Sequence, residues 1–200
     1  VSSSNWCDES AVVGVPPLAL RPPPKTGWSD NTVRVLETED FVEQGYGYHV
    51  FAFWSSRYTW LADGGDDPDN TIVRKLNRHE TEVFHIKKVT PNDPQYIGSD
   101  FHFSCGREVR QFRAQPNAVY ITLKNQHKRA GAIFVFVPRV NIEKVVKVKV
   151  NGDHGLFSVV GSAPHTQRNS SPRVAGRILR IPVIIKADGS PHDGQIQVDF

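Results

Sequence analysis

The eight histidines and two cysteines of this 200-residue sequence could ligate a metal or act as a base or nucleophile. Their spacing does not favour a metal site. His79 and His85 are separated by turn-type residues. His102 and Cys105 would lie on opposite faces of a strand. Neither Cys105 nor Cys7 belongs to a CxxC pair. We therefore predict that no metal and no other cofactor is bound.

Motifs for covalent catalysis and for phosphate binding are also absent from the sequence. It has no GxSxG nucleophile elbow, no Walker sequence and no GxGxxG before a helix. Two cysteines are too few for a disulfide-stapled scaffold, so we expect two free thiols, with a Cys7–Cys105 bridge as the alternative. We predict that the protein is not an enzyme.

The segment Asp63–Asn70, DGGDDPDN, carries four carboxylates on a Gly-containing loop. Oxygen-rich loops can hold Ca²⁺, and Asp188–Gly194, DGSPHDG, is a weaker version of the same pattern. Neither segment has the ligand spacing of an EF-hand, and turns select Asp and Gly for their own reasons. Calcium binding by the Asp63–Asn70 loop therefore stays an open alternative.

Charge is distributed unevenly along the chain. Residues 1–73 contain four Lys or Arg and eleven Asp or Glu, whereas residues 105–180 contain fourteen Lys or Arg and only three acidic residues. This asymmetry indicates an anionic partner for the second part of the chain, or an acidic segment that covers it.

Two groups of basic residues in that second part lie on or beside polar segments and are candidate nucleic-acid contacts. Because the loops at one end of a β-sandwich converge, both groups could face a single phosphate backbone. A scatter of solvated charges is the alternative. The candidates are Lys124, His127, Lys128 and Arg129 in the first group, and His165, Arg168, Arg173, Arg177 and Arg180 in the second.

The elements that must position these groups are strands. Ala118–Leu123 and Ala132–Val137 are rich in β-branched and aromatic residues, and the polar segment between them predicts a hairpin. Both runs are apolar at nearly every position, which indicates strands covered on both faces. Val145–Val150 alternates Val with Lys and should have one wet face. Asn151-Gly152 predicts a tight turn into a return strand at Leu156–Val160.

Further strands are predicted on both sides of this region, around a Pro-containing loop at Thr90–Ser99. Gly106 is expected to break the strand that holds it, and Pro182 should make its strand an edge or bulged strand. No helix of ordinary length is predicted. These further strands are Thr32–Glu37, Tyr46–Trp54, Tyr58–Leu61, Thr81–Val89, Phe101–Arg113, Arg177–Ile185 and Gln195–Phe200.

Aromatic residues cluster at Trp54, Tyr58 and Trp60, with Trp28 further upstream. Such rings could form a platform for stacking sugars, although clustered aromatics more often belong to a core. Asn169 begins a glycosylation sequon that matters only if the chain is secreted.

The sequence as a whole predicts one all-β domain, a single β-sandwich of immunoglobulin-like or jelly-roll type spanning residues 32–200. Residues 1–31, with a Pro-rich middle, should form an extended arm. No apolar run is long enough for a membrane helix, so we expect no membrane partner. The absence of Met suggests a processed product or an excised domain. No motif identifies a family.

Function is expected to be non-enzymatic binding, with nucleic acid as the preferred partner and an intracellular or nuclear location preferred. The first alternative is a structural or assembly protein, such as a viral coat or spike domain, that forms homo-oligomers or binds other subunits. The second is an extracellular carbohydrate- or protein-binding module.

Overall fold

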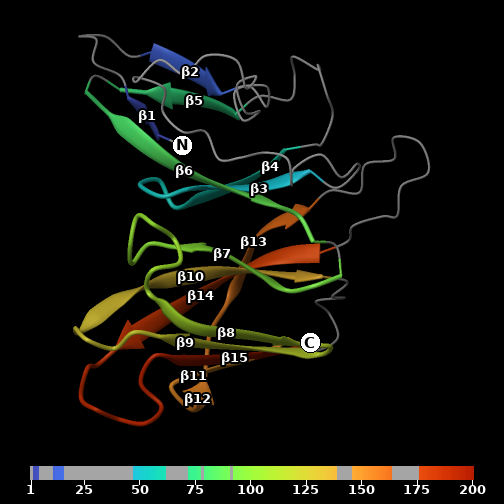
Figure 1. Ribbon diagram of the computed structural model, residues 1–200, viewed down its shortest axis with the longest axis vertical. Helices are drawn as coiled ribbons and strands as arrows, with labels where there is room; N and C mark the ends of the chain where they lie inside the picture. The colour runs from blue at the N-terminus through green and yellow to red at the C-terminus, as the bar shows by residue number, and fades with distance from the viewer. Residues whose placement is uncertain are drawn as a thin grey trace, which may run out of the picture.

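The computed structural model describes residues 2–4, 11–15, 47–61, 72–77, 79–90, 92–138, 146–163 and 176–200. Within them the chain is all-β, and it contains no helix long and apolar enough to cross a bilayer (Figure 1). The strands are β1 (Ser2–Ser4), β2 (Ala11–Val15), β3 (Tyr48–Ala52), β4 (Arg57–Leu61), β5 (Ile72–Leu76), β6 (Thr81–Lys88), β7 (Gln95–Ser99), β8 (Val109–Gln115), β9 (Ala118–Leu123), β10 (Arg129–Pro138), β11 (Lys147–Val150), β12 (Asp153–His154), β13 (Ser158–Ala163), β14 (Gly176–Ile185) and β15 (Gln195–Asp199).

Three antiparallel sheets stack on one another as a layered β-sandwich (Figure 1). The upper sheet has the strand order β1-β6-β3-β4, the central sheet β13-β14-β10-β7, and the lower sheet β12-β11-β15-β9-β8. A separate pair, β2-β5, lies beyond the upper sheet. The predicted β-sandwich class is therefore confirmed.

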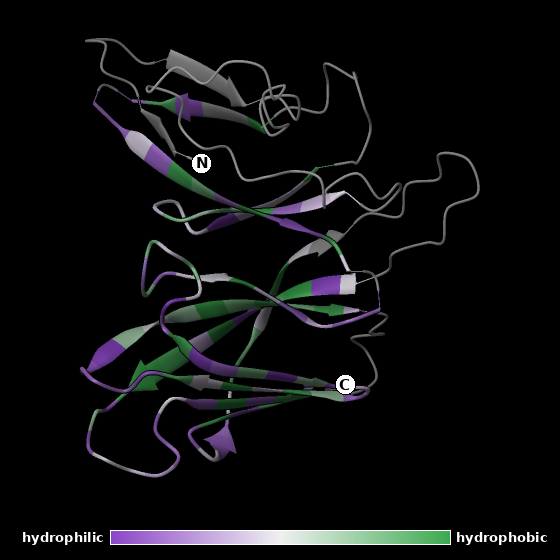
Figure 2. Ribbon diagram, viewed as in Figure 1, coloured by the Kyte–Doolittle hydropathy of each residue, from purple (hydrophilic) through white to green (hydrophobic). Residues whose placement is uncertain are grey.

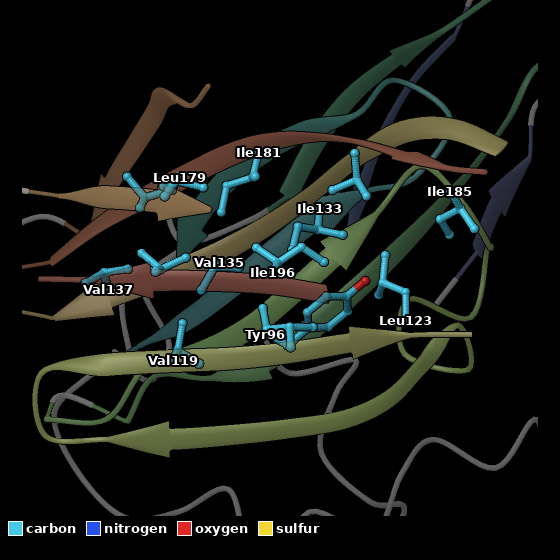
Figure 3. Packing of buried hydrophobic residues seen from close by; sticks show 14 residues of the cluster. Tyr96, Val119, Leu123, Ile133, Val135, Val137, Leu179, Ile181, Ile185 and Ile196 are labelled. Carbon is cyan, nitrogen blue, oxygen red and sulfur yellow. The ribbon is translucent and has the colours of Figure 1, made fainter. Parts of the chain in front are cut away.

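Strand β7 and most of β10 in the central sheet are buried at successive positions and so are covered on both faces, and β10 is apolar along this stretch (Figure 2). In β10, Ile133, Val135 and Val137 face the lower sheet. Figure 3 shows these residues packed against β14 and the strands of the lower sheet. The alternate residues, Phe134 and Phe136 among them, pack toward the upper sheet. The prediction of double burial is confirmed for Ala132–Val137. The apolar area buried on each face stabilises the fold by about 25 cal/mol per Å².

The predicted hairpin between Ala118–Leu123 and Ala132–Val137 is wrong. Strand β9 pairs with β8 and β15, whereas β10 pairs with β7 and β14, so the two strands lie in different sheets. They pack face to face instead of side by side, and both arrangements bury the same apolar residues. Double burial also fails for β9, because Tyr120 points to solvent from the outer face of the lower sheet.

The Asn151-Gly152 turn is confirmed. Both residues have positive φ, at 56° and 91°, as a type I′ turn requires. The strand that returns is only β12, Asp153–His154, and not Leu156–Val160. From Ser158 the chain pairs with β14 instead and so joins the central sheet.

Pro182 was expected to mark an edge or bulged strand, yet β14 lies between β13 and β10. The ladder with β13 ends at the pair Ser158 and Arg180, so Pro182 lies just past the end of β13. On that side no partner strand needs its missing N–H. The strand is interior for part of its length and an edge at the proline.

The predicted loop Thr90–Ser99 contains a strand, β7, that is buried throughout. Gly98 fits there because a Cβ at this position would lie 2.5 Å from the Phe51 ring of the upper sheet. Conversely, the strand predicted at Phe101–Arg113 begins only at Val109. The predicted strand Thr32–Glu37 lies outside the described residues. Most of the predicted arm also lies outside them. Its two described segments are strands: β1 pairs with β6, and β2 pairs with β5.

Candidate nucleic-acid interface

Three connections meet at one end of the sandwich, at the left of Figure 1: β7–β8, β9–β10 and β14–β15. Backbone hydrogen bonds tie them together. The amide of Lys124 donates to the carbonyl of Glu108 at 2.9 Å, and the amide of Leu123 donates to the carbonyl of Gly194 at 2.8 Å. These contacts place the polar residues of all three loops on a common surface.

Basic side chains gather on this surface, which we call the basic end. Four of these side chains are exposed, those of Arg107, Lys124, Lys128 and Lys186, and that of Arg129 is half-buried. The Nζ of Lys124 donates to the carbonyl of Arg107 at 2.5 Å, which joins the β9–β10 loop to the β7–β8 loop. The basic end comprises Arg107, Lys124, Lys128, Arg129 and Lys186.

The carboxylates in these loops are occupied by the fold. Asp193 is buried and accepts hydrogen bonds from the amides of Lys186 and Ala187, both at 2.8 Å. Asp100 accepts from the amide of Ala132 at 2.6 Å. Asp188 is exposed, but its Oδ1 accepts from the amide of Ser190 at 2.9 Å. These carboxylates keep their negative charge, but Glu108 and Asp193 are buried and only Asp188 is exposed, whereas four of the five cations are exposed, so the accessible surface of the basic end is mainly positive.

Glu108 holds the β7–β8 loop in place. Its carboxylate is buried and accepts from the hydroxyls of Tyr96 and Ser99, both at 2.5 Å, and from the amide of Gly106 at 2.8 Å. Burial first, and then the charge of Glu108, keep the pKa of Tyr96 well above its usual value, so the phenol remains a donor. The loop that carries Arg107 is thus anchored by charge-assisted hydrogen bonds.

The structure describes the first predicted basic group in full and brings its members together, and of the second group it describes only Arg177 and Arg180. His127 and Lys128 lie with Lys124 on the β9–β10 loop, and Arg129 begins β10. Arg180 pairs with Phe134, five residues along β10 from Arg129, or about 17 Å at the usual rise of a strand.

Arg177 pairs with Val137, eight residues along β10 from Arg129, or about 27 Å. Arg177 and Arg180 were expected to converge with the β9–β10 loop, and they do not. His165, Arg168 and Arg173 lie outside the described residues.

Arg107 and Lys186 were missed by the sequence reasoning. Each is a single basic residue in its own loop, Lys186 directly after β14. Only the register of the strands shows that these loops meet Lys124. The positive charge of each residue is visible in the sequence, but the residues that lie beside it in the fold are not.

A groove of about 380 Å³ lies beside the β7–β8 loop, between β6 and β8. His85, Lys87 and Cys105 are among the residues that line it. Burial raises the pKa of the Cys105 thiol to about 12, so the free thiol is protonated at neutral pH and is a poor nucleophile. Cys7 lies outside the described residues.

Burial lowers the pKa of His85, and its Nε2 donates to the carbonyl of Phe103 at 2.5 Å. The ring therefore has a structural role in holding the β7–β8 loop against β6. Among the described residues, no group of three or more His, Cys, Asp or Glu is arranged to hold a metal. The Asp63–Asn70 loop lies outside them.

The aromatic cluster does not form a shared platform. Tyr58 and Trp60 lie two residues apart on β4 and pack against the core between the upper and central sheets. Trp54, in the β3–β4 turn, is 63% exposed and contacts Phe53 edge-on with 4.7 Å between the ring centroids. The interpretation as core residues is correct for Tyr58 and Trp60 and wrong for Trp54, and Trp28 lies outside the described residues.

No protein-family model matches the sequence, and no curated protein matches it significantly.

Proposed function

We propose that this protein is a non-enzymatic nucleic-acid-binding module that contacts phosphates through the basic end. One observation carries the proposal: cations from three loops meet on one surface and four of them are exposed, whereas of the four carboxylates in the same loops only that of Asp188 is exposed. A surface with this charge balance attracts a polyanion.

The contacts would be mostly electrostatic. Lys and Arg side chains neutralise backbone phosphates and release counterions, so affinity falls steeply as salt rises. The anchored β7–β8 loop presents Arg107 without a large ordering cost. The β9–β10 loop presents Lys124 and Lys128 beside it.

Reversing two charges at the basic end tests the proposal. We expect Lys128→Glu/Arg129→Glu to weaken binding of a labelled duplex by about ten- to a hundredfold and to reduce the salt slope by about 2. Fluorescence anisotropy across a salt series measures both quantities.

A matched control makes the same change in charge elsewhere. Lys75→Glu/Arg177→Glu alters two exposed residues, one on β5 beyond the upper sheet and one at the far end of β14. It should lower affinity much less. Equal losses in the two double variants would contradict the location, and an unchanged affinity in Lys128→Glu/Arg129→Glu would contradict the proposal.

Assembly with other copies is the second candidate function, and it rests on β13. Within the described strands β13 is an edge of the central sheet, and Val159 and Val160 are exposed on it. Leu156, two residues before β13, is also exposed. Edge strands with unpaired backbone groups can add a strand from another chain. Concentration-dependent oligomers in light scattering that Val160→Lys abolishes would support this function, and a monomer at all concentrations would exclude it.

A further inference from the structure

The outer face of the lower sheet is open, with no described element over it (Figure 1). The inward residues of these strands, such as Val148, Ile196 and Val198, are buried in the core. The alternate residues therefore point outward. We call this outward surface the open face.

A row of directly opposed residues crosses the open face. Lys149 on β11 pairs with Gln197 on β15, Gln197 pairs with Tyr120 on β9, and Tyr120 pairs with Arg113 on β8. His154 on β12 pairs with Lys149 and extends the row by one strand. Directly opposed residues lie on the same face of a sheet, so Tyr120 lies in a polar row with a cation toward each end.

The row is accessible to a ligand. Tyr120 is 38% exposed, and Arg113 and Lys149 are exposed. Tyr120 and Lys149 also line a shallow hollow of about 280 Å³ that reaches His192 and Gly152. From Lys149 to Arg113 the row spans three strand spacings, or about 14 Å.

The charge of the open face is positive. Lys147 lies two residues from Lys149 on the same face, and both are exposed. Asp199 opposes Lys147 and keeps its negative charge while it accepts hydrogen bonds from Nε2 of Gln197, at 2.8 and 3.0 Å, but Arg113, Lys147 and Lys149 outnumber it. The face is also continuous with the basic end, because β9 leads from Tyr120 directly into Lys124.

An exposed ring between cations on a flat sheet suits unpaired bases. Stacking on an aromatic side chain needs an exposed base plane, which a duplex hides inside its stack, and flanking Lys and Arg hold the phosphates. We propose that single-stranded nucleic acid lies across the open face, with a base stacked on Tyr120 and phosphates beside Lys149 and Arg113. This inference rests on the proposed function and specifies the nucleic acid that the protein prefers.

The test compares two probes and three variants by anisotropy at one salt concentration. The probes are labelled oligothymidine and the same strand annealed to oligoadenine. Tyr120→Ala should weaken binding of the single strand roughly tenfold and leave the duplex unaffected, whereas Tyr120→Phe keeps the ring and should bind like the wild type. Trp54→Ala removes another exposed aromatic ring, in the β3–β4 turn of the upper sheet, and should change neither affinity.

Each other outcome is informative. If the wild type binds both probes and Tyr120→Ala loses nothing, the open face is not the single-strand site, although the basic end still binds nucleic acid. A single-strand loss with Trp54→Ala alone would move the stacking ring to the β3–β4 turn and overturn the inference. If the wild type binds neither probe at low salt, the proposed function itself fails. Loss of both probes with Tyr120→Ala but not with Tyr120→Phe would also contradict a single-strand site.

Discussion

Replacing Glu108 with alanine is expected to lower the free energy of unfolding by about 3–5 kcal/mol. The change leaves three donors without an acceptor: the buried hydroxyls of Tyr96 and Ser99 and the half-buried amide of Gly106. Each unsatisfied donor carries a desolvation cost that its hydrogen bond had offset. Chemical denaturation of the wild type and the variant measures the difference.

Glu108→Gln is the matched control for this prediction. The amide oxygen can still accept from Tyr96 and Ser99, but its NH₂ group faces the amide of Gly106, so a smaller loss is expected. Glu108→Ala should also speed the reaction of Cys105 with a thiol reagent, because Cys105 belongs to the β7–β8 loop that Glu108 anchors. A loss below about 1 kcal/mol would contradict the anchoring role of Glu108.

Acidification is expected to destabilise the protein through His49, which is fully buried between the upper and central sheets. Its Nδ1 lies 2.8 Å from the hydroxyl of Tyr58, and its Nε2 lies 3.2 Å from Oε1 of Gln95. That oxygen already accepts from the amide of Thr90 at 2.7 Å, so Nε2 carries the proton and Nδ1 accepts from Tyr58. Both ring nitrogens of a neutral His49 therefore have a hydrogen-bond partner.

Burial is the main reason that the pKa of His49 falls from 6.5 to about 4. Between these values the unfolded chain binds the proton and the folded chain does not, so the stability present above pH 6.5 is lost as pH falls toward 4. The shift corresponds to about 3 kcal/mol. Denaturation at pH 7 and pH 4 measures it.

The variant His49→Gln isolates this contribution from the carboxylates that titrate in the same range. It should lose about 3 kcal/mol less than the wild type between the two pH values, although it is less stable at pH 7. His127→Gln, at an exposed position, should behave like the wild type. Parallel pH profiles for the wild type and His49→Gln would show that His49 is not held neutral by the fold.

Local patterns predicted single strands better than their partners. The unbroken apolar run at Ala132–Val137 correctly indicated a strand buried on both faces, and Asn151-Gly152 correctly indicated a tight turn. The same periodicity could not show that β9 and β10 face each other across the core, because side-by-side and face-to-face packing bury the same residues. Strand β7 was missed because its residues, Gln95–Ser99, owe their burial to the sheets around them.

The candidate site was predictable only where its residues are contiguous. Lys124, Lys128 and Arg129 lie within six positions of the sequence, and they lie together in the fold. Arg107 and Lys186 join them through the strand topology, which no local pattern contains. The register of β14 against β10 separates Arg177 from this group, and the row that contains Tyr120 exists only through four strand pairings.

The salt dependence of nucleic-acid binding tests the central claim most directly. The affinity of the wild type for a labelled oligonucleotide is measured by anisotropy across a series of salt concentrations. Contacts from the five cations of the basic end predict that the logarithm of the affinity falls linearly with the logarithm of the salt concentration, with a slope of about −4. Absence of binding at low salt, or an affinity that salt does not change, would contradict the claim that the basic end is a phosphate-binding surface.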